Sequence, residues 1–456
     1  MKKTALINVV GLSKKLIGQH TPFLTKWSAD KNVSSIDPVL PAITCPVQTT
    51  YLTGKWPEEH GIVANGWFYR DVQEVRSWHQ SNKLVQATSI WDHAKKIDPS
   101  FTCANMFWWF NMYSTVDYAV TPRPQYRADG LKIPDCYSAP SDLRDRLQEE
   151  LGTFPLFHFW GPKTTIKSSE WIANASKKVH KWHNPDLLLV YLPHLDYVLQ
   201  KFGHDEKHLP KDLQEIDKVC EYLITYLEQQ GVEVNVISEY GITSVSQPIH
   251  INRILREIGL IAIREENGLE LLDAGASKAF ATADHQIAHV YINDLSQKDT
   301  IKTKLEQTEG IELVLDTEGK KLHHIDHERA GELVVVADQK SWFTYYYWED
   351  DKMAPDFARI VDIHKKPGYD PVEMFIDPKK KLIVPRIVLK LLRKKLGFRT
   401  LMDFIPLDAS LIKGSHGRIN LNEEDKAIFI ANSQHQHATS IDPTQIKDLM
   451  LNQIFS

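Results

Sequence analysis

The sequence predicts an α/β protein with a mostly parallel central sheet, helices on both faces and cap-like insertions. Short apolar runs rich in Val and Ile alternate with longer stretches whose apolar residues recur at helical spacing. Buried parallel strands are nearly continuous apolar runs, and a strand–helix–strand order produces parallel βαβ units. The chain has 456 residues, of which 42% are hydrophobic, so it can bury a large core.

The main elements can be placed by their boundaries. Three apolar runs are predicted strands: Thr4–Val10, Leu187–Leu192 and Val232–Ile237. Thr21 is expected to cap a helix over Pro22–Ala29, because proline favours the first helical position. A longer helix is expected over Asp212–Gln230, with Gly231 as its C-cap.

Two insertions are expected to divide the core. Residues 1–100 form its first part, 101–170 an aromatic and proline-rich insertion, 171–340 its second part, 341–405 a second insertion, and 406–456 a return to the core. The first insertion includes four consecutive aromatic residues, Phe107 to Phe110. These either face a substrate, where Trp108 could stack on a planar group, or form an aromatic satellite core, which is the commoner arrangement.

Composition and charge exclude several classes of protein. The net charge of −5 argues against a protein that coats nucleic acid or anionic lipid, so neither a nucleic-acid polymer nor a membrane is an expected partner. Basic runs such as 379–381 and 393–395 are typical of solvated faces. There is no apolar run long enough to span a bilayer. Four widely spaced cysteines without a CxxC motif indicate reduced thiols and a cytoplasmic location.

The stretch from Pro41 to Asn65 contains the clearest chemical signal. Pro46 lies in the first turn of a predicted helix that stops at Gly54, which makes Thr44 the expected N-cap. Free backbone N–H groups and the helix dipole would then surround the Thr44 hydroxyl and favour an anion. Simple capping is the ordinary role of such a threonine. A nucleophilic role requires a base or a metal ion nearby.

Two acidic residues are expected to meet Thr44. Asp196 follows the predicted strand Leu187–Leu192, and Glu239 follows Val232–Ile237. Ligands of open α/β sheets bind beyond the carboxyl ends of the strands. The two carboxylates and the Thr44 hydroxyl should therefore converge at one edge of the sheet.

These residues resemble the alkaline phosphatase superfamily, in its nucleotide pyrophosphatase/phosphodiesterase (type I phosphodiesterase) branch, with phosphonoacetate hydrolase as a near relative. The matching residues of the nucleophile motif are Thr44-Cys-Pro46, Thr53-Gly54, Pro57-Glu-Glu-His60-Gly61-Ile62 and Asn65. Further matches are Asp196, the Ser-Glu-Tyr-Gly run that contains Glu239, and Gly414-Ser-His416-Gly417.

The resemblance implies an alkaline-phosphatase-like core and a metal-dependent hydrolase of phosphodiester, pyrophosphate or phosphonate bonds in a small phosphorylated substrate. It implies Thr44 as the nucleophile and Asn65 as a phosphoryl-oxygen contact. It also implies Asp196, Glu239 and His416 as metal ligands, with His364 as a competing or additional ligand.

Three positions depart from the family pattern and make the metal site degenerate. Val10 stands where an Asp is expected, Gln200 where a His is expected, and Tyr240 replaces the His of an Asp-His pair. One divalent ion is therefore favoured over two, with zinc expected and manganese or magnesium as alternatives. The alternative function is a non-catalytic or altered-chemistry member that binds a phosphorylated or acidic ligand. Other histidines could substitute as ligands, although each is expected to be structural: His194, His204, His285 and His289.

Overall fold

A computed structural model describes residues 1–128, 130–432 and 438–456. Within these ranges the central sheet has nine strands, and its five middle strands are parallel. In spatial order the strands are β23 (Ser440–Ile441), β2 (Lys31–Ile36), β22 (Ala427–Asn432), β11 (Glu233–Ile237), β1 (Thr4–Val9), β10 (Leu187–Leu192), β5 (Cys103–Met106), β6 (Tyr118–Pro122) and β9 (Cys136–Ala139). Asn8 in β1 pairs with Tyr191 in β10 and with Ile237 in β11. The predicted α/β architecture is confirmed.

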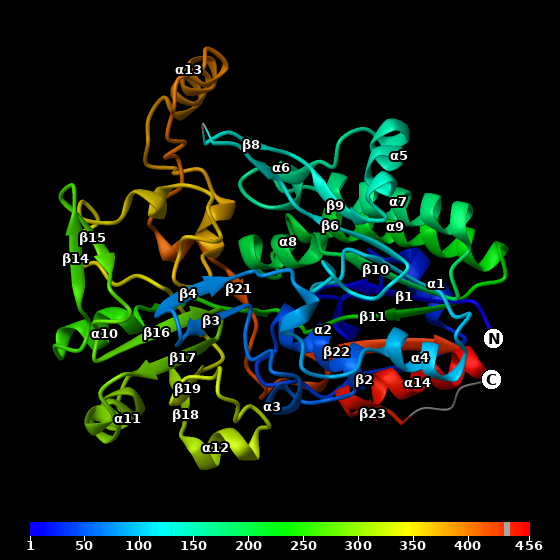
Figure 1. The fold of residues 1–456 in the computed structure, drawn as a ribbon, viewed down its shortest axis with the longest axis horizontal. Coiled ribbons are helices and arrows are strands. Elements are labelled where there is room, and N and C mark those ends of the chain that lie inside the picture. The colour runs from blue at the N-terminus through cyan, green and yellow to red at the C-terminus, as the bar shows by residue number, and fades with distance from the viewer. Residues whose placement is uncertain (129, 433–437) are drawn as a thin grey trace.

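Helices cover both faces of this sheet (Figure 1). One face carries α7 (Lys167–His183), α8 (His194–Phe202) and α9 (Leu209–Gln229), and the other carries α2 (Thr44–Thr53), α4 (Ile90–Ile97) and α14 (Ile446–Phe455). α7 packs on β10 and on α9, whereas α14 contacts both α2 and α4. The apolar residues of α9 that recur at helical spacing are buried, as the sequence predicts.

The predicted boundaries agree with the structure to within a few residues. β1 ends at Val9, and the first helix, α1, spans Pro22–Ser28. α9 begins at Leu209, before the predicted start, because Pro210 is accommodated in its first turn. Its C-cap is Gln230 rather than Gly231, and Gly231 follows with a left-handed φ of 76°.

A second, antiparallel sheet lies beside the first. Among the described residues it has four strands, in the order β16 (Ala279–Asp284), β17 (Ile287–Ile292), β19 (Leu333–Ala337) and β18 (Ile311–Leu315). The helices α10 (Ile251–Glu257), α11 (Lys298–Glu306) and α12 (Thr317–Leu322) surround it (Figure 1). The remaining elements include α3 (Pro57–His60), β3 (Gly66–Tyr69), β4 (Glu74–Ser77), β7 (Gln125–Tyr126), β8 (Lys132–Ile133), α5 (Ser141–Leu151), α6 (Leu156–Phe159), β12 (Thr243–Ser244), β13 (Gln247–Ile249), β14 (Ile263–Glu266), β15 (Leu269–Leu272), β20 (Ser341–Phe343), α13 (Ile383–Lys395) and β21 (Gly414–Ser415).

The aromatic run after β5 is packed in the interior. Phe107 and Trp108 belong to the core around the central sheet, and Trp109 and Phe110 belong to a second cluster with β3 and β17. Trp108 is fully buried, so the idea that it stacks on a ligand is wrong, because its ring has no face open to solvent.

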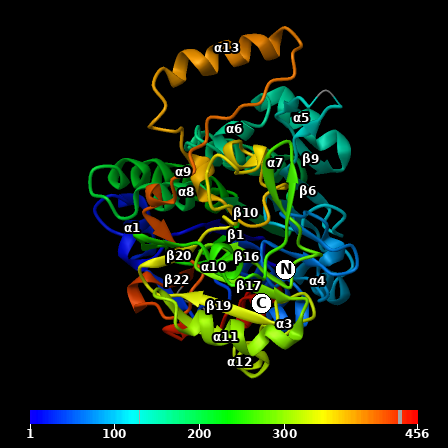
Figure 2. The same ribbon diagram turned by 90° about the vertical axis from the view of Figure 1, so that its left-hand side faces the viewer.

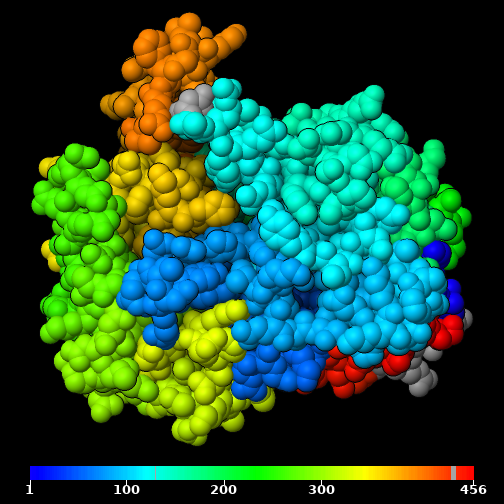
Figure 3. Space-filling view, in the orientation of Figure 1, coloured from blue at the N-terminus to red at the C-terminus, as the bar shows by residue number. Residues whose placement is uncertain are grey.

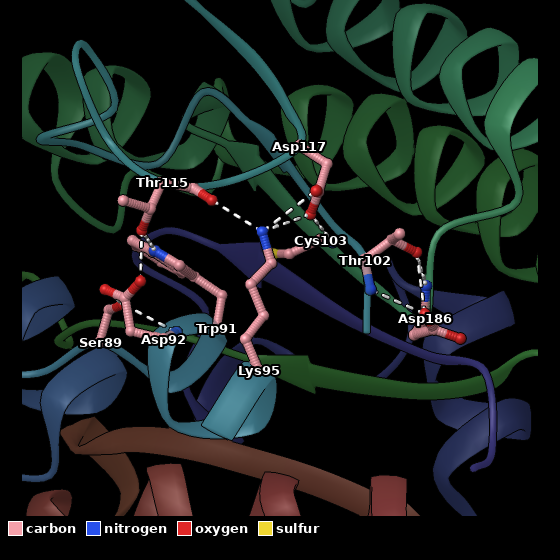
Figure 4. A network of polar contacts seen from close by, with 9 residues as sticks. All are labelled: Ser89, Trp91, Asp92, Lys95, Thr102, Cys103, Thr115, Asp117 and Asp186. Atoms are coloured by element: carbon pink, nitrogen blue, oxygen red, sulfur yellow. Dashed lines mark hydrogen bonds and ion pairs between the residues drawn. The ribbon is translucent and has the colours of Figure 1, made fainter. Parts of the chain in front are cut away.

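A polar network lies at the amino-terminal ends of the parallel strands (Figure 4). Lys95 of α4 donates to the Thr115 carbonyl at 2.9 Å and pairs with Asp117 at 3.0 Å, while Asp117 accepts from the Cys103 backbone N–H at 2.8 Å. At the start of β10, Asp186 accepts from Thr102 at 2.8 Å. These contacts anchor strand beginnings and lie away from the edge where the chemistry is expected.

Two further observations bear on the predictions from composition. No helix in the described ranges is both long and apolar enough to cross a bilayer. The four cysteines, Cys45, Cys103, Cys136 and Cys220, are buried and unpaired. The cytoplasmic location stays a prediction.

Candidate active site at the carboxyl ends of the central strands

Helix α2 starts beside the carboxyl ends of β1, β10 and β11, and Thr44 is its first residue. Ile43, in an extended conformation with φ −134° and ψ 160°, occupies the N-cap. The prediction of Thr44 as the N-cap is therefore wrong by one position, because Thr44 already has helical geometry. The helix ends at Gly54 with a left-handed φ of 64°, as the sequence predicts. The side chain of Thr44 is thus fixed at the positive end of the helix dipole.

The Thr44 hydroxyl belongs to a chain of hydrogen bonds that ends on Asp196. Thr44 Oγ1 lies 3.0 Å from the Tyr240 hydroxyl, and Tyr240 donates to Asp196 Oδ1 at 3.2 Å. A phenol has a single proton to donate. Since Tyr240 gives that proton to Asp196, Thr44 is the donor in the first bond. The series of hydrogen bonds therefore runs from the Thr44 hydroxyl through the Tyr240 hydroxyl to the Asp196 carboxylate.

Glu239 lies next to these hydrogen bonds, close enough to Thr44 for its hydroxyl to lower the pKa of Glu239 slightly, and is held by two amide groups. Its Oε1 accepts from Asn8 Nδ2 at 2.6 Å and from Gln48 Nε2 at 2.5 Å, whereas its Oε2 is buried without a hydrogen-bond partner. Burial raises the pKa of Glu239 to about 8. Asn8 and Gln48 had no assigned role in the sequence prediction, because an amide in a buried strand or helix carries no functional signature by itself.

His416 completes the inner part of the site. Its Nδ1 donates to the Ala42 carbonyl at 2.7 Å, which leaves Nε2 as the nitrogen with a free lone pair. Nε2 has no hydrogen-bond partner and lies 3.6 Å from Asp196 Oδ1. Burial, reinforced by the neighbouring His285, lowers the pKa of His416 well below its usual value. His416 is therefore a neutral imidazole that faces a carboxylate.

Asn65 holds the start of α2. Its Oδ1 accepts from the Cys45 backbone N–H at 2.9 Å, and its Nδ2 donates to Asp284 Oδ1 at 3.3 Å. Asp284 also accepts from His285 Nδ1 at 2.6 Å, and burial raises the pKa of Asp284 to about 7. The predicted contact between Asn65 and a phosphoryl oxygen stays a prediction. In this structure the Asn65 amide links the helix to the second sheet.

The turn between β16 and β17 brings Asp284 and His285 into the site; His285 was one of the four histidines considered as substitute ligands, although it was expected to be structural, and Asp284 had no predicted role. His285 has φ 60°, its Nε2 is buried without a partner, and its ring lies 3.8 Å from that of His416. Its ring also stacks on Tyr369 at 3.8 Å. The sequence did contain a signal for these two residues. Asp284 and His285 form an Asp-His dipeptide at a strand end, and an Asp-His pair is what the family pattern has where this chain has Glu239 and Tyr240.

The structure separates His364 from this group. His364 Nδ1 donates to the Ser77 carbonyl at 3.1 Å, and the neighbouring Tyr369 reaches the site instead. The Tyr369 hydroxyl donates to Gln200 Oε1 at 2.7 Å, and Gln200 Nε2 donates to Asp196 Oδ2 at 3.0 Å. Gln200 therefore acts as a hydrogen-bonding bridge at the position where the family pattern has a ligand histidine.

The other candidate histidines lie outside the group. His204 Nε2 donates to the Ile242 carbonyl at 2.8 Å, and His289 Nε2 donates to the Val63 carbonyl at 3.1 Å. Both therefore have structural hydrogen bonds, as expected. His194 lies 3.0 Å from Asp212 and 3.8 Å from Glu215 of α9.

Buried acids dominate the electrostatics of the site. Burial raises the pKa of Asp196 to about 7, in addition to the raised values of Glu239 and Asp284. No ion pair between these three acids and a lysine or arginine is found in the described part of the chain. Uncompensated buried carboxylates are costly, so they take up protons or pair with a cation.

The residues present do not fit two metal ions. Val10 is a fully buried aliphatic side chain, Tyr240 bridges Thr44 and Asp196, and Gln200 is occupied by two hydrogen bonds. Two donors, Asp196 Oδ1 and the unpartnered His416 Nε2, are close enough to share one ion. Glu239 is too far from this pair to form a three-residue metal site with it. Among the described residues, the group of three possible ligands whose ligand atoms all lie within 4.8 Å of one another is His194, Asp212 and Glu215, which lies outside the candidate active site.

A model of the type I phosphodiesterase/nucleotide pyrophosphatase family matches residues 4–370. The chain belongs to this family. The match includes the nucleophile motif, Asp196, Glu239 and the Asp284–His285 pair. His416 lies beyond the matched residues.

Similar curated members of the family come from eukaryotes. An uncharacterised pyrophosphatase/phosphodiesterase of Schizosaccharomyces pombe is 28% identical over 249 residues, which are 52% of this chain and 41% of that protein. Ectonucleotide pyrophosphatase/phosphodiesterase 2 of Saccharomyces cerevisiae is 25% identical over 53% of this chain and 48% of its own. The chain thus spans less than half the length of these relatives.

Two solved structures share the fold. Murine ectonucleotide pyrophosphatase/phosphodiesterase 5, an inactive form in complex with AMP, gives a TM-score of 0.60 at 14% identity over 100% of this chain and 95% of that one. Phosphonoacetate hydrolase from Sinorhizobium meliloti 1021, in complex with phosphonoformate, gives a TM-score of 0.61 at 14% identity over 99% and 96%. This likeness supports the predicted alkaline-phosphatase-like core.

Proposed function

We propose that the chain hydrolyses phosphodiester, pyrophosphate or phosphonate bonds of small phosphorylated molecules, with Thr44 as the nucleophile. The observation that carries this proposal is the hydrogen-bonded chain from Thr44 through Tyr240 to Asp196 at the first turn of α2. Membership of a phosphodiesterase and pyrophosphatase family supports the reaction class. The AMP and phosphonoformate bound to its structural neighbours support a small phosphorylated ligand.

The chain's own residues supply the first step. Thr44 Oγ1 attacks phosphorus, its proton passes to the Tyr240 oxygen, and the Tyr240 proton passes to Asp196 Oδ1. The bond from phosphorus to the leaving oxygen, or to the leaving carbon of a phosphonate, breaks. The proton on Asp196 Oδ1 passes to the leaving group, which departs. The positive end of the α2 dipole stabilises the negative charge that develops on the phosphoryl oxygens.

Water completes the reaction. It attacks the phosphothreonine, releases the phosphorylated product and returns a proton to Thr44, so that a covalent intermediate divides the hydrolysis into two displacements. Neutral His416 faces Asp196 with a free nitrogen and is the nearest imidazole that can take a proton from this water.

The ligand atoms present support the prediction of a single divalent ion. Asp196 and His416 would hold it in place of the protons that they accept in the metal-free steps above, with zinc first and manganese or magnesium as alternatives. When bound, it would supply positive charge that favours an ionised hydroxyl. The buried acids of the site would gain a counter-charge.

The test is turnover of bis(4-nitrophenyl) phosphate, a nitrophenyl pyrophosphate ester and a phosphonate, each with EDTA, Zn²⁺ or Mn²⁺. Thr44→Ala should reduce turnover by roughly 1,000-fold or more. The matched control is Thr49→Ala, because Thr49 lies on the same helix and its buried hydroxyl donates only to the Cys45 carbonyl, at 2.7 Å. Equal turnover in Thr44→Ala and the parent chain would contradict the proposal.

The second candidate function is binding of a phosphorylated or acidic ligand without turnover. The observation that favours it is the set of departures at Val10, Gln200 and Tyr240, which removes most donors of a two-ion site. A thermal shift with AMP or inorganic phosphate, without hydrolysis of any of the three substrate classes under any metal condition, would select this function.

A further inference from the structure

Helix α13 projects from the rest of the molecule (Figures 1 and 2). It is connected by two extended segments, and its atoms form a knob on the surface in the space-filling view (Figure 3). No residue of α13, all of which the structure describes, is buried. A helix of 13 residues that lacks buried side chains gains little from packing on its own protein.

The apolar side chains of α13 face outward. Val384, Val388, Leu391, Leu392 and Leu396 follow the spacing i, i+4, i+7, i+8 and i+12, which places them on one side of the helix. Their exposed fractions are 65%, 49%, 47%, 54% and 75%. Leu389, which is 60% exposed, lies three residues before Leu392 and borders the strip. The chain therefore presents a contiguous apolar strip to the exterior, whereas soluble surfaces rarely keep such a strip uncovered.

The inward side of the same helix is the less exposed and more polar one. Ile383, Ile387, Lys390 and Lys394 are only partly exposed. Lys390 forms an ion pair with Asp403 and donates to the Leu401 carbonyl at 2.7 Å. These contacts fix which side of α13 faces the body, so the outward direction of the leucines is determined by the fold.

The charge around the strip has one sign. The segment 378–402 contains no Asp or Glu, and its basic residues are Lys379, Lys380, Lys381, Arg386, Lys390, Arg393, Lys394, Lys395 and Arg399. Three of them pair with acids at the foot of the segment: Lys379 with Asp408, Lys380 with Asp377 and Lys390 with Asp403. Arg386 and Arg393 are exposed beside the apolar strip, and the exposed Lys395, four residues after Leu391, lies within its last turn.

We propose that α13 docks this chain on an anionic lipid bilayer, with the leucine strip inserted at the interface and the flanking cations on the headgroups. An apolar face bordered by Lys and Arg is the chemistry of interfacial helices. Nucleic acid would engage the cations but leave the leucines uncovered. The docking is peripheral and uses no membrane-spanning helix. It revises the expectation, drawn from the net charge of −5, that no membrane is involved.

A buried ion-pair cluster precedes this element in the sequence. Lys366 is fully buried and pairs with Asp370 and Glu373 at 2.7 Å each. Tyr369, between these acids and Lys366 in sequence, donates to Gln200 in the candidate active site. The docking itself does not depend on the proposed hydrolysis.

The experiment is co-sedimentation of the full chain with sucrose-loaded vesicles of phosphatidylcholine alone, or with about one third phosphatidylglycerol. We expect binding to the anionic vesicles to be at least about tenfold tighter, and to weaken between roughly 0.1 and 0.5 M NaCl. Leu389→Glu/Leu392→Glu should abolish binding. Arg386→Glu/Arg393→Glu/Lys395→Glu should weaken it at least about tenfold.

The controls are matched by residue type and exposure. Leu322→Glu replaces a leucine on α12 that is 76% exposed, and Lys26→Glu/Lys83→Glu/Lys218→Glu reverses three exposed charges elsewhere. Both should bind vesicles as the parent chain does. All replaced residues are exposed, so unchanged thermal unfolding of each variant is expected and would show that the fold is intact.

Three outcomes would overturn the proposal. These are no sedimentation with anionic vesicles, equal binding to both vesicle types, and retained binding in both α13 variants. If the parent chain ignores vesicles but forms oligomers that Leu389→Glu/Leu392→Glu dissociates in sedimentation velocity, the strip is covered by a second copy and the lipid proposal is wrong.

Discussion

The ring of Tyr240 lies parallel to the imidazole of His416, with 3.6 Å between the ring centroids and 7° between the ring planes. The family pattern has a histidine at position 240, and the tyrosine keeps an aromatic ring there while adding a hydroxyl. That hydroxyl joins Thr44 to Asp196. The tyrosine therefore changes the hydrogen bonds of the site without leaving a cavity.

We predict that Tyr240→Phe retains the fold and loses activity. The ring stack on His416 stays, while the two hydrogen bonds that orient the Thr44 proton disappear. Turnover of a nitrophenyl diester should fall roughly 100-fold, and the free energy of unfolding should change by only about 1 kcal/mol. Steady-state kinetics and urea denaturation measure the two effects. A variant with full turnover would exclude Tyr240 from the proton path.

We predict that restoring the family ligands restores metal binding. Val10→Asp/Gln200→His/Tyr240→His should retain more zinc per chain than the parent after gel filtration, measured by mass spectrometry of the metal. An Asp212→Asn background removes the separate group His194, Asp212 and Glu215. Two zinc ions per parent chain in that background would contradict the conclusion that its residues do not fit two ions.

We predict that His60 makes folding sensitive to acid. His60 is fully buried, bonds Thr50 at 3.0 Å and accepts from the Ile62 backbone N–H at 3.1 Å; burial lowers its pKa from 6.5 to about 3. The unfolded chain binds this proton more readily than the folded chain. The stability contributed by neutral His60 is therefore complete above pH 6.5 and is lost as the pH falls towards 3.

The measurement is urea denaturation between pH 7.5 and pH 4. His60→Asn should flatten the pH dependence by up to about 1.4 kcal/mol per pH unit below pH 6.5. Identical slopes for His60→Asn and the parent chain would show that another group is responsible for the acid sensitivity.

We predict that Lys366→Met is strongly destabilising. Its removal leaves Asp370 and Glu373 buried without their cation, which should lower the free energy of unfolding by about 3–5 kcal/mol. Lys55→Met, which breaks an exposed pair with Glu59, should leave the free energy of unfolding nearly unchanged. A similar effect of the two variants would mean that the buried cluster does not anchor this part of the chain.

Part of the candidate site could be predicted from the sequence because its cues are local. The rule that parallel strands present their carboxyl ends at one edge places Asp196 and Glu239 near Thr44, and the structure brings them together. Glycine in the left-handed conformation ends α2 at Gly54, as expected. Local patterns could not show that Glu239 is held by Asn8 and Gln48, because those contacts span 231 and 191 residues of sequence.

The sequence by itself determined the α/β class, the strands that form the middle of the sheet, and Thr44 at the start of α2. Hydrophobic periodicity and turn residues encode these features over short stretches. Only the tertiary structure decided which side chains share protons and charges in the site. Asp284, His285 and Tyr369 enter from segments far from α2, and the outward direction of the leucines on α13 depends on how Lys390 meets Asp403. Such contacts depend on how separate elements pack, and no local pattern records that packing.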